Sequence, residues 1–140
     1  MTTAIDTNVI VTLWDADPAL SAAAQAALEA AFSRGGLVVA APVFAELIAA
    51  PGRSEDFISS FLEDTSIAVD WNLEEKIWKS AGRAFQRYAE KRRRQRESGA
   101  RRILADFVIG AHAEVRGYRL LTLDAGLYRT AFPKVTIETF

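Results

Sequence analysis

The chain has 140 residues, of which 50% are hydrophobic and 25% charged, and its formal net charge at pH 7 is −1. This length suits one domain with a substantial core, and the near-neutral charge indicates no particular class of partner. The sequence has no cysteine and one histidine, which excludes disulfides, cysteine nucleophiles, thiolate metal sites and histidine-rich metal sites. A bound metal would therefore need oxygen ligands, which favours Mg²⁺, Mn²⁺ or Ca²⁺.

The first half of the chain alternates β-prone runs with helical ones. Pro18 suits the first turn of a helix, whereas the pair Pro51 and Gly52 is typical of a helix end. The expected elements are a strand at 2–5, a helix at 7–14, a helix at 19–33, a strand at 37–40 and a helix at 42–50.

The second half continues this alternation. Ser54 can cap a helix whose apolar face carries Phe57, Ile58, Phe61 and Leu62. The expected elements after that helix are a strand at 67–69, a long helix from about residue 72 past residue 88, a helix at 103–115, and strands at 119–123 and 135–137. Ser98 and Gly99 are expected to end the long helix.

This order of elements predicts the α/β class. We expect one domain over residues 1–140, with a central parallel sheet of four to five short strands and helices on both faces. The strands are continuously apolar, as is typical when both faces of a sheet are buried. No apolar run reaches the roughly 18 residues of a membrane helix, and no signal peptide is visible. We therefore expect a cytoplasmic protein without a membrane partner.

Four carboxylates stand alone in apolar runs: Asp6 in TAIDTNVIV, Glu46 in AAPVFAELIAA, Asp106 in RILADFVIGAHA and Asp124 in LLTLDAGL. An acid in such a run is costly unless its charge is compensated. Asp6 and Asp124 directly follow strand-like runs, at the sheet edge where open parallel sheets bind ligands. Glu46 and Asp106 fall in the first turns of expected helices. We expect the four to converge on a divalent cation.

Structural roles are the alternative for three of these acids. Asp6 could cap the helix that begins at Thr7, Asp124 could begin a turn, and Glu46 could face solvent. Asp106 has the sharpest local argument, because Asp106 and His112 are the only polar side chains from residue 103 to 113. A helix that is apolar nearly all round is buried, so a lone aspartate within it needs a partner. His112 is expected to be a hydrogen-bonded helix residue rather than a catalytic base.

The segments IDTNVI, APVFAEL, LADFVIGAHA and LLTLD, in this order and spacing, resemble the PIN-domain ribonucleases. They look most like the VapC toxins of bacterial and archaeal toxin–antitoxin pairs, and the resemblance covers nearly the whole chain. It implies a single PIN-like nuclease domain. It also assigns the acidic metal-binding and catalytic cluster to Asp6, Glu46, Asp106 and Asp124. Supporting hydrogen bonds to a carboxylate or water are expected from Thr7, Asn8 and Thr122.

The resemblance implies an Mg²⁺-dependent endoribonuclease, with Mn²⁺ as the alternative ion, that acts as a toxin. Such an enzyme hydrolyses RNA phosphodiester bonds by metal-activated water and leaves a 5′-phosphate and a 3′-hydroxyl. The expected partners are an RNA substrate, a VapB-like antitoxin and a second copy of the chain in a homodimer. One departure is a basic stretch before Asp106 that is longer than expected of a short VapC toxin.

Nine of the seventeen lysines and arginines lie within residues 83–102. Such density can bind a phosphate backbone without reading sequence, although a solvated helix end is the usual outcome for a charge run. The candidate RNA-binding residues are Arg87, Lys91, Arg92, Arg93, Arg94, Arg96, Arg101 and Arg102.

Two other functions remain open at this point. IDTN loosely resembles the first motif of haloacid-dehalogenase-like phosphatases, but that family needs a second aspartate where Asn8 stands. A non-catalytic RNA-binding module of the same fold is the other alternative. Trp14, Trp71 and Trp78 are expected in the core. The face of Phe57 to Leu62 could line a groove for a partner peptide or belong to a plain amphipathic helix.

Overall fold

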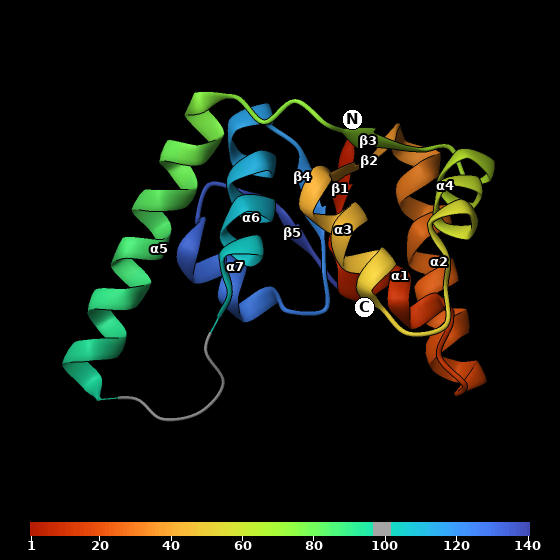
Figure 1. The fold of residues 1–140 in the computed structure, drawn as a ribbon, viewed down its shortest axis with the longest axis horizontal. Coiled ribbons are helices and arrows are strands. Elements are labelled where there is room, and N and C mark those ends of the chain that lie inside the picture. Colours follow the sequence, from red (N-terminus) through yellow and green to blue (C-terminus); the bar gives the residue numbers. More distant parts are fainter. Residues whose placement is uncertain (97–101) are drawn as a thin grey trace.

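Five parallel strands form the centre of the fold, in the spatial order β3-β2-β1-β4-β5 (Figure 1). The computed structural model describes residues 1–96 and 102–140. Its strands are β1 (Thr3–Ile5), β2 (Leu37–Ala40), β3 (Ile67–Asp70), β4 (Arg119–Leu121) and β5 (Ile137–Glu138). The central strand β1 places Ala4 between Val38 of β2 and Leu120 of β4.

Seven helices flank the sheet in the described part of the chain. They are α1 (Thr7–Leu13), α2 (Pro18–Arg34), α3 (Ala41–Ala49), α4 (Glu55–Asp64), α5 (Glu75–Gln95), α6 (Leu104–Arg116) and α7 (Ala125–Ala131). Helices α5 and α6 lie side by side at one end of the molecule in Figure 1, and α2 and α4 lie at the other. None of these helices is long and apolar enough to cross a membrane within the described ranges.

The core is built from strands buried on both faces and from α6. Every residue of β1 and β2 is buried, as expected for central strands of a covered parallel sheet. Helix α6 is buried continuously from Phe107 to Ala113. Gly110 of this helix lies against Phe132, so closely that a Cβ atom here would be 2.2 Å from the ring. The missing side chain of Gly110 therefore allows the segment after α7 to pack on α6.

The expected α/β fold, with a parallel sheet and helices on both faces, is confirmed. Helix α7 was not expected, because it has seven residues with Gly126 in its first turn and so shows little helical periodicity. The last strand begins at Ile137 rather than Val135. The helix break expected at Ser98 and Gly99 lies outside the described residues.

The expected burial of the tryptophans is wrong in two of three cases. Trp71 is 63% exposed and Trp78 is 47% exposed. Trp71 follows the edge strand β3 and packs edge-on against Phe44 at the surface. Only Trp14 of the three packs against the core, where it makes edge contacts with Phe57 and Phe61. For Trp71 the position after an edge strand thus overrides the apolar character of the side chain, whereas Trp78 lies on the exposed face of α5.

Candidate active site

Asp6 lies at the end of β1 and is 5% exposed. One of its carboxyl oxygens accepts a hydrogen bond from the Thr7 backbone N–H at 2.7 Å, so Asp6 caps α1. The other oxygen accepts from Thr122 Oγ1 at 2.7 Å. Burial raises the pKa of Asp6 from 3.8 to about 6 in spite of these hydrogen bonds. The cap expected as an alternative is therefore present, but it leaves the charge of Asp6 only partly compensated.

Thr122 and Asn8 join the ends of the neighbouring strands β1 and β4. Thr122 is fully buried, and its Oγ1 accepts a hydrogen bond from the Asp124 backbone N–H at 2.9 Å. Asn8 Oδ1 accepts from the backbone N–H of Leu123 at 3.1 Å. These contacts fix the turn after β4 against the start of α1. They bring the backbone N–H of Asp124 to the hydroxyl of Thr122, which also donates a hydrogen bond to Asp6.

Asp106 lies in the first turn of α6, where its carboxylate accepts a hydrogen bond from the Ile103 backbone N–H at 3.3 Å. Burial raises the pKa of Asp106, and the nearby Asp124 carboxylate also raises it. The charge of Asp106 in turn contributes to the raised pKa of Asp6. Asp106 therefore lies within electrostatic reach of both Asp6 and Asp124. We refer to these three as the acidic group.

Glu46 is joined to the acidic group through Thr7. Thr7 Oγ1 donates a hydrogen bond to Glu46 Oε1 at 2.6 Å, while the Thr7 backbone N–H donates to Asp6. Glu46 is half-buried in α3. Because it accepts the hydrogen bond from Thr7, it does not merely face solvent, which was the alternative expected from the sequence. Thr7 thus links two acids that are 40 residues apart in sequence.

Tyr128 of α7 is a residue of this region that the sequence did not single out. Its side chain is fully buried, and its hydroxyl has no hydrogen-bond partner within the part of the chain that the structure describes. Burial raises the pKa of Tyr128, and the charges of Asp6, Asp106 and Asp124 raise it further. The hydroxyl lies near enough to Asp6 to lower the pKa of that carboxyl. Tyr128 follows Asp124 by four residues, a spacing that places two side chains on the same face of a helix. The sequence did not reveal this because α7 was not expected to be a helix.

The sequence profile of the PIN domain matches residues 3–133. The chain belongs to the PIN-domain family. Its structure is similar to a chain of the VapBC2 complex from Rickettsia felis bound to a promoter DNA fragment, with TM-score 0.72 and 17% identity over 99% of this chain and 98% of that one. It is also similar to a chain of VapBC-1 from nontypeable Haemophilus influenzae, with TM-score 0.69 and 19% identity over 99% and 98%. A third similar chain, in a toxin–antitoxin complex from Klebsiella pneumoniae, gives TM-score 0.67 and 17% identity over 96% and 95%.

None of the curated proteins compared by sequence matches the chain. At identities of 17–19% the structural likeness establishes a shared fold. The expected PIN-type α/β domain is therefore confirmed by the family match and by the fold of chains found in VapBC complexes.

In this PIN domain, Arg102 places a positive charge against the acidic group. Its two terminal nitrogens contact the two carboxylate oxygens of Asp124, one of them at 3.3 Å. The Arg102 guanidinium also lowers the pKa of Asp106, against the stronger effect of burial. Arg102 was expected to bind RNA, and in the structure its guanidinium pairs with Asp124, an acid of the site. The contact between Arg102 and Asp124 could not be predicted from the sequence, because it depends on the tertiary fold.

The side chains of the acidic group have the chemistry that a hard divalent cation requires. They offer carboxylate oxygens, two with raised pKa values, beside the unpartnered hydroxyl of Tyr128. Across residues 1–96 and 102–140, however, no three histidine, aspartate or glutamate side chains form a ready-made cage for an ion. The donor set fits the ion, while the Arg102 guanidinium holds Asp124 in the present arrangement.

The other basic candidates lie mostly on the last turns of α5. Lys91, Arg93, Arg94 and Arg96 are exposed there. Arg87 donates a hydrogen bond to the Ala131 carbonyl at 3.4 Å. Arg92 is half-buried, and Arg101 lies outside the described residues. The exposed cations at the end of α5 thus point to solvent, and Arg93 among them lines a cavity with Arg102 and Ile103.

His112 has the structural surroundings expected for it. It is fully buried in α6, and its Nε2 lies 3.1 Å from Asp70 Oδ2 at the end of β3. Burial lowers the pKa of His112, which keeps the ring neutral at pH 7. This contact ties α6 to the edge strand and involves none of the acidic group.

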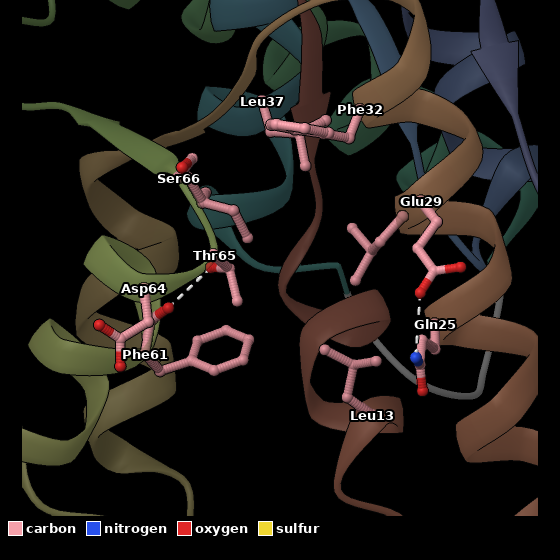
Figure 2. A pocket seen from close by; sticks show the side chains of 11 residues that line it. Leu13, Gln25, Glu29, Phe32, Leu37, Phe61, Asp64, Thr65 and Ser66 are labelled. Atoms are coloured by element: carbon pink, nitrogen blue, oxygen red, sulfur yellow. Dashed lines mark hydrogen bonds between the residues drawn. The ribbon is translucent and has the colours of Figure 1, made fainter.

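An apolar cavity of about 500 Å³ lies between α2 and α4, beside β3 (Figure 2). Leu13, Leu28, Phe32 and Phe61 supply much of its apolar lining, and Phe32 is 55% exposed. Polar groups surround it, including Gln25, which donates a hydrogen bond to Glu29 at 3.0 Å (Figure 2). Of the α4 face noted in the sequence, Ile58 and Leu62 are buried, whereas Phe61 lines this cavity.

Proposed function

We propose that this PIN domain is an Mg²⁺-dependent endoribonuclease, with Mn²⁺ as the alternative ion, and the toxin of a toxin–antitoxin pair. The observation that carries the proposal is the electrostatic interaction of Asp106 in α6 with Asp6, at the end of β1, and with Asp124, after β4. A structural role alone does not explain a buried carboxyl whose pKa is raised to about 6 by burial and by the charge of Asp106. Membership of the PIN-domain family supports the same chemistry.

The four acids have different parts in this proposal. Asp6 and Asp106 would hold the ion, with Asp124 and Glu46 as further ligands or as acceptors that orient water. When bound, the ion would lower the pKa of water and neutralise charge that develops on the phosphate. Thr122 and the Thr7 backbone fix the carboxyl of Asp6, and Thr7 Oγ1 fixes Glu46. Arg102 would leave Asp124 and turn to a phosphate oxygen of the substrate.

The RNA substrate is supported by the cations beside this site. Lys91, Arg93, Arg94 and Arg96 extend the positive charge of Arg102 along α5. Such a surface binds the phosphate backbone through charge and releases counterions. We include the contact of these residues with RNA in the proposal, together with a cytoplasmic location.

A VapB-like antitoxin is the proposed partner, and a homodimer the proposed assembly. Chains of similar fold occur in VapBC complexes. The apolar cavity between α2 and α4 in Figure 2 could receive the apolar face of an antitoxin helix. The groove suggested by Phe57 to Leu62 in the sequence thus involves Phe61 and residues of α2 rather than that face alone.

The deciding experiment compares cleavage of labelled RNA by the wild type and Asp6→Asn, with Mg²⁺ or with EDTA. We expect products only from the wild type with Mg²⁺. Asp17→Asn is the matched control, because Asp17 caps α2 as Asp6 caps α1, but is exposed. This control should cleave as the wild type does. Equal cleavage by Asp6→Asn and the wild type would reject the proposed mechanism.

A non-catalytic RNA-binding module is the second candidate, favoured by the ion pair between Arg102 and Asp124. In that case the acids would serve to hold Arg102 rather than an ion. RNA binding that is unchanged by Asp6→Asn, with no uptake of Mg²⁺ or Mn²⁺ in calorimetry, would support this reading. The phosphatase alternative gains nothing from the structure, since Asn8 accepts a backbone hydrogen bond from Leu123.

A further inference from the structure

A second cavity, of about 530 Å³, lies between α5 and the two residues before α6, Arg102 and Ile103. Phe85 and Tyr88 of α5 line it together with Arg93, Arg102 and Ile103. Its volume is within the range of pockets that bind small organic groups. The cavity is distinct from the apolar one in Figure 2, which lies between α2 and α4.

This cavity shares a wall with the acidic group. Arg102 lines the cavity, and its guanidinium contacts the carboxylate of Asp124. Ile103 also lines it, and the Ile103 backbone N–H donates to Asp106 at 3.3 Å. The backbone N–H of Arg102 donates to Tyr88 Oη at 2.8 Å, which fixes this wall to α5. A group bound in the cavity would therefore lie next to the acids.

The cavity combines aromatic surface with positive charge. The rings of Phe85 and Phe107 are stacked, with centroids 4.7 Å apart and 8° between the planes. The Tyr88 ring lies 5.4 Å from that of Phe107, so both aromatic residues of the cavity are held against α6. Aromatic rings stack on nucleobases, and arginine binds the adjoining phosphates.

We propose that this cavity is a subsite for one unpaired nucleobase of the RNA strand, adjacent to the phosphate that is cleaved. The inference rests on the proposed ribonuclease function and adds to it the place where one base of the strand is bound. A base inside a duplex has both faces covered by its neighbours, so only an unpaired base can enter. The residues that line the cavity in the described part of the chain include no acid, which suits a strand of phosphates.

The test is equilibrium binding of short single-stranded RNA in EDTA at low ionic strength, which reports on recognition without cleavage. A set of oligonucleotides carries one abasic site, moved one position at a time. For the wild type we expect about a tenfold loss of affinity when the abasic site falls at one particular position, as base–aromatic stacking predicts. Tyr88→Leu should bind intact RNA about tenfold more weakly and lose this dependence on position, whereas Tyr88→Phe should keep it.

Arg93→Gln and Arg83→Gln form a second, matched pair, since both arginines are exposed on α5 and only Arg93 lines the cavity. Arg93→Gln should reduce the loss of affinity that an abasic site causes at the one sensitive position of the oligonucleotide. Arg83→Gln should leave that loss unchanged. These exposed substitutions keep the test informative if Tyr88→Leu fails to fold.

Three results would overturn the proposal. Equal affinity for every abasic oligonucleotide, together with Asp6-dependent cleavage, would reject the subsite and leave the proposed function intact. A wild type that neither binds nor cleaves RNA would reject both. The third result compares RNA with a glutamate-rich peptide as the ligand. If the wild type binds the peptide and Tyr88→Leu does not, while Tyr88→Leu binds RNA normally, the cavity belongs to a protein partner instead.

Discussion

At the scale of single residues, Asp6 is a carboxyl whose ionisation the fold opposes. Its pKa rises from 3.8 to about 6, so the folded protein retains the Asp6 proton to higher pH than the unfolded chain does. The contribution of Asp6 to the free energy of unfolding therefore falls as pH rises from about 4 to 6. Above this range Asp6 is ionised in the folded protein, and the full loss of stability is reached. A bound cation would remove this cost.

We therefore predict that Asp6→Asn stabilises the protein at pH 7.5 in EDTA by about 1–3 kcal/mol, and by little at pH 4. Asparagine caps a helix as well as aspartate does, so the substitution preserves the start of α1. Urea unfolding at the two pH values measures the difference. Asp17→Asn, the exposed cap of α2, should change stability by little at either pH. A destabilised Asp6→Asn at pH 7.5 would contradict the prediction.

Arg102 contributes the opposite charge at the same site. Because its guanidinium contacts Asp124, it competes with any cation that Asp124 would bind. We predict that Arg102→Gln tightens binding of Mn²⁺ by about 3–10-fold in calorimetry, a modest gain because the side chain is 40% exposed and screened by solvent. Arg83→Gln is the control, because it removes a positive charge from α5 rather than from the contact with Asp124, and it should change the affinity for Mn²⁺ by less. Weaker binding of Mn²⁺ by Arg102→Gln would mean that Arg102 supports the site rather than blocks it.

At the scale of elements, α6 and the segment after α7 meet at Gly110. A Cβ atom at this position would lie 2.2 Å from the ring of Phe132, which is buried and has little room to move. We predict that Gly110→Ala lowers the free energy of unfolding by about 1–2 kcal/mol in denaturant titrations, although alanine favours helix. Gly82→Ala in α5, where a Cβ meets nothing within 4 Å, should instead stabilise the protein. Adding Phe132→Leu to Gly110→Ala should recover part of the loss.

The elements also show what local sequence can predict and what it cannot. Proline, glycine and apolar runs mark β1, β2, α2 and α6, and these appear within about one residue of expectation. Helix α7 carries no such marks and is formed because Tyr128 and Phe132 are buried against the core. Asp6 and Asp124 could be inferred as neighbours because adjacent parallel strands end at the same edge. The contacts of Arg102 and Tyr128 could not, because they depend on how distant segments pack.

At the scale of the whole molecule, a net charge of −1 conceals a separation of charge. Carboxylates gather at the carboxyl ends of β1 and β4, while the end of α5 carries consecutive cations. An RNA strand would be attracted to α5 and repelled by the acids until a cation neutralises them. Binding by α5 and neutralisation of the acids should therefore be separable.

We predict that Lys91→Glu with Arg94→Glu weakens RNA binding and reduces the magnitude of its salt slope by about 1.4, the value for two lost contacts to single-stranded RNA. Both residues are exposed on the last turns of α5. The matched control is Lys76→Glu with Lys79→Glu, which makes the same change of net charge at the start of the same helix. If binding depended only on net charge, the two double variants would lose affinity equally. A smaller effect of the control would instead locate the RNA path at the end of α5, beside the cavity lined by Arg102, whose guanidinium contacts Asp124.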